Sequence, residues 1–221
     1  MFKGVDKKLE RVEHFLNNLK ALADEAGGFP YIKRTKQQEM RANLDGFFFE
    51  VISAKDFFLQ GVNDKFAGLP RDEATKISKL KHCLSSQSTV EALKVVEQLE
   101  KGLSDSTSWL WAINNYRNSA THRELLGVGH KATIPLDRDT IEKIQQGKYK
   151  IKLIYEGEER DVPPGTPRVN VPRENIKTYL FKDPEDPTKG NADIEVIPYC
   201  EQSLTKMREL LERLYSELGL E

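Results

Sequence analysis

A histidine, arginines and asparagines fall close together in the segment from Trp111 to Arg123, which reads WAINNYRNSATHR. Imidazole titrates near neutral pH and can therefore move protons. A guanidinium stays charged and can form two parallel hydrogen bonds to phosphate oxygens. Cleavage of a phosphodiester by the neighbouring ribose 2′-hydroxyl needs these two functions. Arg117 and His122 therefore predict a phosphate-handling site.

The helical spacing of this segment separates an apolar side from a polar one. At about 100° per residue, the core side is expected to hold Trp109, Ile113, Tyr116 and Ala120. The nearly opposite side is expected to hold Trp111, Asn115, Asn118 and His122. Arg117 lies about 140° from His122, so one ideal helix does not bring the two side chains together. A long arginine side chain closes part of that gap, and a second copy of the helix in a homodimer would close the rest.

The segment Arg117-Asn118-Ser119-Ala120-Thr121-His122 resembles the motif of the HEPN superfamily (higher eukaryotes and prokaryotes nucleotide-binding domains). That motif is an arginine, four to six residues and a histidine, often with a polar residue directly after the arginine. The resemblance implies an all-helical bundle with the motif late in the penultimate core helix. It covers about residues 5–127 and 198–218 and leaves 128–197 outside.

Many members of that superfamily are described as metal-independent ribonucleases that act as dimers, and others are inactive and serve in binding or assembly. The resemblance implies that Arg117 holds the scissile phosphate, that His122 transfers protons and that Asn118 orients or contacts the substrate. Asn115 and Arg123 are further candidates for substrate binding. We therefore expect a ribonuclease, or an RNA- or nucleotide-binding protein, acting as a homodimer.

A non-catalytic reading of the same residues stays open. Polar side chains on the back of an amphipathic helix are often simply solvated. They would also suit the surface of a non-catalytic dimeric interaction or scaffold protein. Convergence of Arg117 and His122 in an open cleft would favour catalysis, whereas a dry and satisfied polar network would favour a structural role.

The rest of the chain predicts the helices that must position this segment. Helices are expected over 5–26 and 34–66, from Pro70, from a capping box at Ser88–Glu91 to Gly102, from a cap at Ser104 or Ser106 to Gly127, and from Pro198 to Gly219. The last of these has a leucine-rich stripe that is too apolar to stand alone in water. We therefore expect it to pack with the first two helices.

Residues 128–197 differ from the helical segments in composition and pattern, because they contain proline-rich turns and the main strand-like segments of the chain. Strands are expected over 150–155, 176–181 and 193–197, and a short helix over 139–146. The sequence predicts a mainly α fold, a bundle of about five to six helices. We expect a single HEPN-like helical domain over 1–221, with a small β-rich insertion at 128–197 before the last helix.

Composition narrows the classes of partner. The chain has 221 residues and a net charge of −1, so no overall charge attracts it to nucleic acid. No apolar run approaches the ~20 residues that cross a bilayer, and the charged N-terminal segment is unlike a secretory signal. We therefore expect a cytoplasmic protein without a membrane partner, whose cysteines, Cys83 and Cys200, stay reduced.

Other kinds of site find little support in the sequence. The four histidines and two cysteines show no metal-ligand spacing. Gly127-Val128-Gly129 follows a helix rather than a strand, unlike a phosphate-binding glycine loop. His130 is a weaker candidate for a second proton-transfer group. We expect neither a metal nor a cofactor.

Overall fold

The computed structural model describes residues 2, 4–25, 34–122, 128–132, 138–146, 152–154, 168–170, 176–182 and 190–220. Its helices are α1 (Val5–Glu25), α2 (Arg34–Val62), α3 (Ile77–Ser86), α4 (Val90–Ser104), α5 (Trp109–His122), α6 (Arg138–Gln145) and α7 (Val196–Glu217). Its strands are β1 (Val128–Ala132), β2 (Lys152–Ile154), β3 (Arg168–Asn170), β4 (Ile176–Lys182) and β5 (Gly190–Glu195). The predicted fold class, mainly helical with strands before the last helix, is confirmed.

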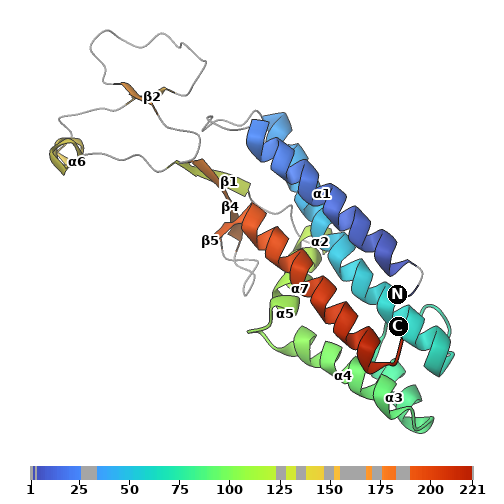
Figure 1. The fold of residues 1–221 in the computed structure, drawn as a ribbon. Helices are drawn as coiled ribbons and strands as arrows, with labels where there is room; N and C mark the ends of the chain where they lie inside the picture. Colours follow the sequence, from blue (N-terminus) through green and yellow to red (C-terminus); the bar gives the residue numbers. More distant parts are fainter. Residues whose placement is uncertain are drawn as a thin grey trace.

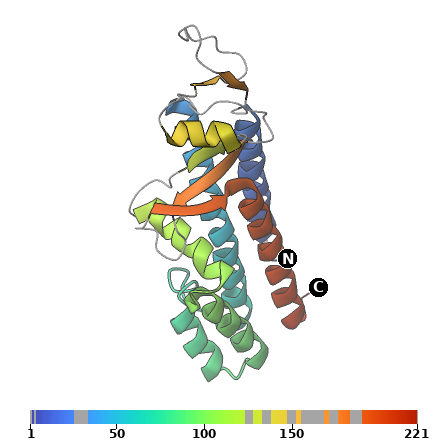
Figure 2. The same ribbon diagram turned by 90° about the vertical axis from the view of Figure 1, so that its left-hand side faces the viewer.

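The long helices lie side by side in a bundle. Figure 1 shows α1 and α2 as a hairpin with α7 along it, and α3 and α4 gathered at one end. The strands lie toward the other end, next to the start of α7 (Figure 2). Helix α5 packs against α2 and α4 and so connects the two ends.

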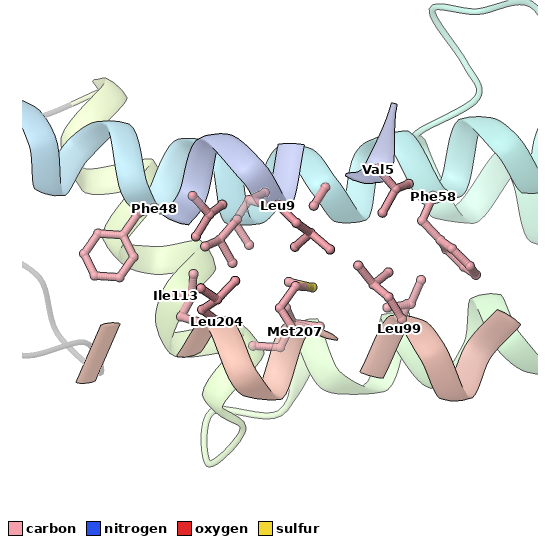
Figure 3. Close-up of a cluster of buried hydrophobic side chains, with 14 of the residues drawn as sticks. Val5, Leu9, Phe48, Phe58, Leu99, Ile113, Leu204 and Met207 are labelled. Atoms are coloured by element: carbon pink, nitrogen blue, oxygen red, sulfur yellow. The ribbon is translucent and has the colours of Figure 1, made fainter. Parts of the chain in front are cut away.

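One apolar core joins these helices. Its members come from six helices, α1, α2, α3, α4, α5 and α7, and those labelled in Figure 3 are Val5, Leu9, Phe48, Phe58, Leu99, Ile113, Leu204 and Met207. All of these side chains are buried, because the apolar positions of each helix recur at three- and four-residue spacing and form one stripe. The core positions α5, which carries the candidate site.

The last helix returns to the first, as its leucine stripe predicts. Contacts along α1 and α7 run in antiparallel order: Lys20 pairs with Glu201 at 2.6 Å, Glu13 with Arg208 at 2.5 Å, and the Phe2 backbone N–H donates to the Tyr215 hydroxyl at 2.5 Å. Exposed ion pairs contribute little to stability, so the apolar stripe dominates this packing. The prediction that α7 packs with α1 and α2 is confirmed.

A close approach and a largely buried ion pair fix the hairpin of α1 and α2. The Phe15 ring covers Gly46, where an added Cβ would lie 2.6 Å from the ring. Lys8 Nζ lies 2.7 Å from Glu50 Oε2, and the two side chains are 13% and 9% exposed. Phe49 and Phe57 flank the same ammonium group. Phe49 itself lies on the surface, whereas its neighbours Phe47 and Phe48 are buried.

Several predicted helix boundaries are wrong. The helix expected from Pro70 begins at Ile77 instead, because Pro70 starts a turn in which its carbonyl accepts from the N–H groups of Glu73 and Ala74. The capping box at Ser88 does not form, since Ser88 has a φ of 58°. The predicted end of the second helix near residue 66 agrees with the structure, because α2 ends at Val62 and continues as one π-helical turn, Asn63–Ala67.

The boundaries of α5 and α7 also differ from the prediction. Ser104 donates to carbonyls of its own helix, and Ser108 caps α5 by accepting from the Leu110 N–H at 3.2 Å. The expected end of this helix at Gly127 lies outside the described residues. Helix α7 begins two residues before Pro198, which is tolerated because the first turn of a helix needs no N–H donor there.

The strands form two small sheets. Strands β1, β4 and β5 pair antiparallel in the order β1-β4-β5, and β2 pairs parallel with β3. The expected strands over 150–155 and 176–181 and the helix over 139–146 match β2, β4 and α6 closely, whereas β5 begins three residues before the expected 193. Strands β1 and β3 were not predicted.

Candidate functional site

The core side of α5 is closed by aromatic packing. Ile113 and Tyr116 are fully buried, as predicted, whereas Trp109 is only half-buried. The Tyr116 ring stacks on Phe48 of α2 with centroids 5.0 Å apart and meets the edge of Tyr199 of α7 at 5.8 Å. These contacts join α5 to both long helices at the turn that carries Arg117.

The opposite side of α5 is partly open to solvent. Its predicted members Trp111, Asn115 and Asn118 are all half-buried, and so is Arg117. This side is therefore neither a sealed polar network nor a fully solvated surface. A half-buried guanidinium next to amide groups can hold an anion, because its charge is only partly screened by water there.

Arg117 and Asn118 are joined by a hydrogen bond. Arg117 Nη1 donates to Asn118 Oδ1 over 3.0 Å. Consecutive helical residues point about 100° apart, so the long arginine side chain bends back around the helix to reach its neighbour. The bond turns the guanidinium toward the Asn118 side of α5.

The side chains of the remaining predicted proton-transfer and binding residues lie outside the described residues. His122 is the last residue of α5, but its side chain and the whole of Arg123 lie outside the described residues. Convergence of Arg117 with His122 therefore stays a prediction. His130 lies in β1, paired with Thr178 of β4, and its side chain is also outside the described residues.

Tyr199 supports the site from α7, a role that the motif in α5 does not indicate. Burial raises the pKa of its hydroxyl well above the ordinary value for tyrosine, so this group stays protonated. The only signal in the sequence is an aromatic residue next to Pro198, at the start of the last helix. Tyr199 contributes an aromatic wall beneath the turn of Arg117.

The described part of the chain yields three further findings. Its cysteines, Cys83 and Cys200, are free, and Cys200 is buried in the core. None of the helices in the described ranges is both long and apolar enough to span a membrane. Among the same residues, no three histidine, cysteine, aspartate or glutamate side chains are grouped as metal ligands would be.

Comparisons with protein-family models, with curated proteins and with solved structures find no match to this chain.

Proposed function

We propose that this chain is a HEPN-like, metal-independent ribonuclease that binds RNA as a homodimer. The observation that carries the proposal is the half-buried Arg117, hydrogen-bonded to Asn118 on the open side of α5, in the same helix as His122. An arginine offers a charged fork to phosphate, and a histidine can transfer protons near neutral pH. The pair supplies a phosphate contact and one of the two proton-transfer groups that transesterification of RNA requires.

In the proposed reaction, the ribose 2′-oxygen attacks the adjacent phosphorus while the bond from phosphorus to the 5′-oxygen breaks. A neutral imidazole of His122 accepts the proton of the 2′-hydroxyl. A protonated imidazole donates a proton to the departing 5′-oxygen. The products are a 2′,3′-cyclic phosphate and a 5′-hydroxyl. Arg117 stabilises the additional charge on the phosphorane oxygens.

The need for two proton-transfer groups is the argument for a dimer. One copy of α5 carries a single histidine in its motif, and the partner's copy would supply the second. The half-buried Trp111 lies on the same side as Asn118 and suits the centre of a two-fold interface, where aromatic residues are enriched. Sedimentation at micromolar concentration tests this step, and a monomer would contradict it.

Cleavage of a fluorophore-quencher RNA in EDTA tests the proposal as a whole. Wild-type protein is expected to cleave in the presence of EDTA and to leave cyclic phosphate ends. His122→Ala should reduce the rate by roughly 10²-fold or more, as for loss of a general acid or base. Absence of cleavage of any RNA, a requirement for added metal, or full activity of His122→Ala would each refute the proposal.

The half-buried Trp111 also favours a second candidate, a non-catalytic dimeric interaction or scaffold protein. In that case Trp111, Asn115, Asn118 and His122 form a partner surface. Alanine variants at Arg117 and His122 would then lower the melting temperature of the dimer by a similar amount. The protein would not cleave RNA in any condition.

A further inference from the structure

Arg41 of α2 lies at the end of a helix face that is otherwise buried. Counting back from Phe48 by seven residues gives two turns, so Arg41 and Phe48 point within about 20° of each other. Further along the same face lie Ile52, Lys55 and Leu59, and all three are buried. Arg41 itself is half-buried. It therefore continues the α2 face that carries Phe48, at a position that is more exposed.

The guanidinium of Arg41 includes a buried hydrogen-bond donor without an acceptor in the described part of the chain. Its Nε is shielded from solvent and finds no hydrogen-bond acceptor among the described residues. A buried donor without an acceptor destabilises the fold, and more so when it is charged. Asp45, one turn away along α2, does not hydrogen-bond this Nε. An anion that reaches Arg41 would remove this cost.

The register of the two helices places Arg41 beside the polar end of α5. Phe48 stacks on Tyr116, which directly precedes Arg117. Helix α5 runs back along α2, and β1, which follows α5 in the chain, contacts α2 (Figures 1 and 2). Arg41 lies about 10 Å before Phe48 along α2, on the side toward which α5 ends. The two arginines thus flank the segment from Arg117 to His122.

We propose that Arg41 is a second phosphate-binding residue, which holds a neighbouring phosphate of the RNA strand whose scissile phosphate lies at Arg117. This inference rests on the proposed function. Contacts from Arg41 and Arg117 to successive phosphates would fix the direction of the strand across α5. They would also supply local positive charge that the net charge of −1 does not.

The test compares Arg41→Gln with Arg11→Gln, both in a His122→Ala background, in which cleavage is slow. Arg11 is a matched control, because it is 64% exposed and pairs with Glu50 on the other side of α2. Binding of a single-stranded 12-nucleotide RNA is measured at several salt concentrations. Arg41→Gln should flatten the plot of log affinity against log salt by about 0.7, the value for one lost phosphate contact on a single strand. Arg11→Gln should leave the slope unchanged.

The conservative variant Arg41→Lys should restore most of the slope, whereas loss of fold would not depend on the charge at this position. Equal slopes for Arg41→Gln and the Arg11→Gln control would overturn the inference and leave the proposed ribonuclease intact. If the wild-type protein does not bind RNA, the proposed function fails, and the Nε–Hε NMR signal of Arg41 is then titrated with inorganic phosphate. A saturable shift that Arg11 lacks would support the anion site, and no shift would refute it.

Discussion

The two sides of α5 differ in burial and in chemical character. On one side, Ile113 and Tyr116 are fully buried and pack on α2 and α7. On the other side, Asn115, Asn118 and Arg117 are half-buried. Burial of large apolar side chains contributes kilocalories, whereas partly exposed polar groups contribute little to folding. The polar side can therefore change without loss of the fold, so its composition is available for function.

The largest expected effect is on the buried side. Phe48→Ala removes the ring that stacks on Tyr116 and leaves a cavity, so the free energy of unfolding should fall by about 3–5 kcal/mol. Urea denaturation followed by circular dichroism measures it. Phe49→Ala is the matched control, because Phe49 is 42% exposed and its loss should cost much less. Similar losses of unfolding free energy in the two variants would contradict the prediction that the buried ring stabilises the fold more than the exposed one.

The next effect is expected on the polar side and in activity alone. Arg117→Ala should slow RNA cleavage by roughly 10²-fold, because it removes a charged contact to the phosphorane. Its unfolding free energy should change by no more than about 0.5 kcal/mol, as for surface substitutions. Asn115→Ala should retain more activity than Arg117→Ala. A large loss of stability in Arg117→Ala would instead assign this residue a structural role.

A smaller effect tests how tightly the buried side of α5 is packed. Ile113→Val deletes one buried methylene group and should cost about 0.5–1.5 kcal/mol of unfolding free energy. RNA cleavage should be unchanged, since the substitution keeps the shape beneath Arg117. A thermal melt and a cleavage assay on the same preparation measure both quantities. No measurable cost would mean that the core side tolerates cavities as easily as the polar side does.

The smallest effect is a pH dependence at the other end of the bundle. Burial raises the pKa of Tyr215 to about 12. Its neutral hydroxyl therefore adds stability that is fully present below pH 10 and is lost as the pH rises through 12. Tyr215→Phe should show a smaller decline of melting temperature between pH 9 and 11. Absorbance of tyrosinate at 295 nm should show one high-pKa tyrosine fewer, and an unchanged titration curve would contradict the assignment.

Much of the helical framework could be predicted because apolar periodicity records which side of a helix is buried. The leucine stripe of the last helix predicts its return to α1 across a long intervening segment. Boundaries were less predictable, since they depend on local backbone geometry. Ser88 has the right side chain for a cap but a left-handed backbone, and Thr89 hydroxyl donates to the Leu84 carbonyl instead of capping α4. Strand β1 was missed because VGHKA has no alternation of apolar and polar residues.

The candidate site was predictable in outline for the same reason. Helical spacing alone places Asn115 and Asn118 away from the core, and the structure shows them half-buried. The bond from Arg117 to Asn118 was not predictable, because it depends on how a long side chain bends around the helix. Arg41 was not singled out either. Its position matters only through the register of α2 on α5, which distant packing decides.

The antiparallel pairing of α1 with α7 has a consequence for synthesis. The apolar seam of α1, with Leu9, Val12 and Leu16, needs the 22 residues of α7 before the core is complete. Those residues are synthesised long after α1, at a rate of about 5–20 residues per second. Until then the nascent chain carries an unfinished apolar groove in water. The growing polypeptide therefore passes through a stage of many seconds in which it is open to chaperones and to aggregation.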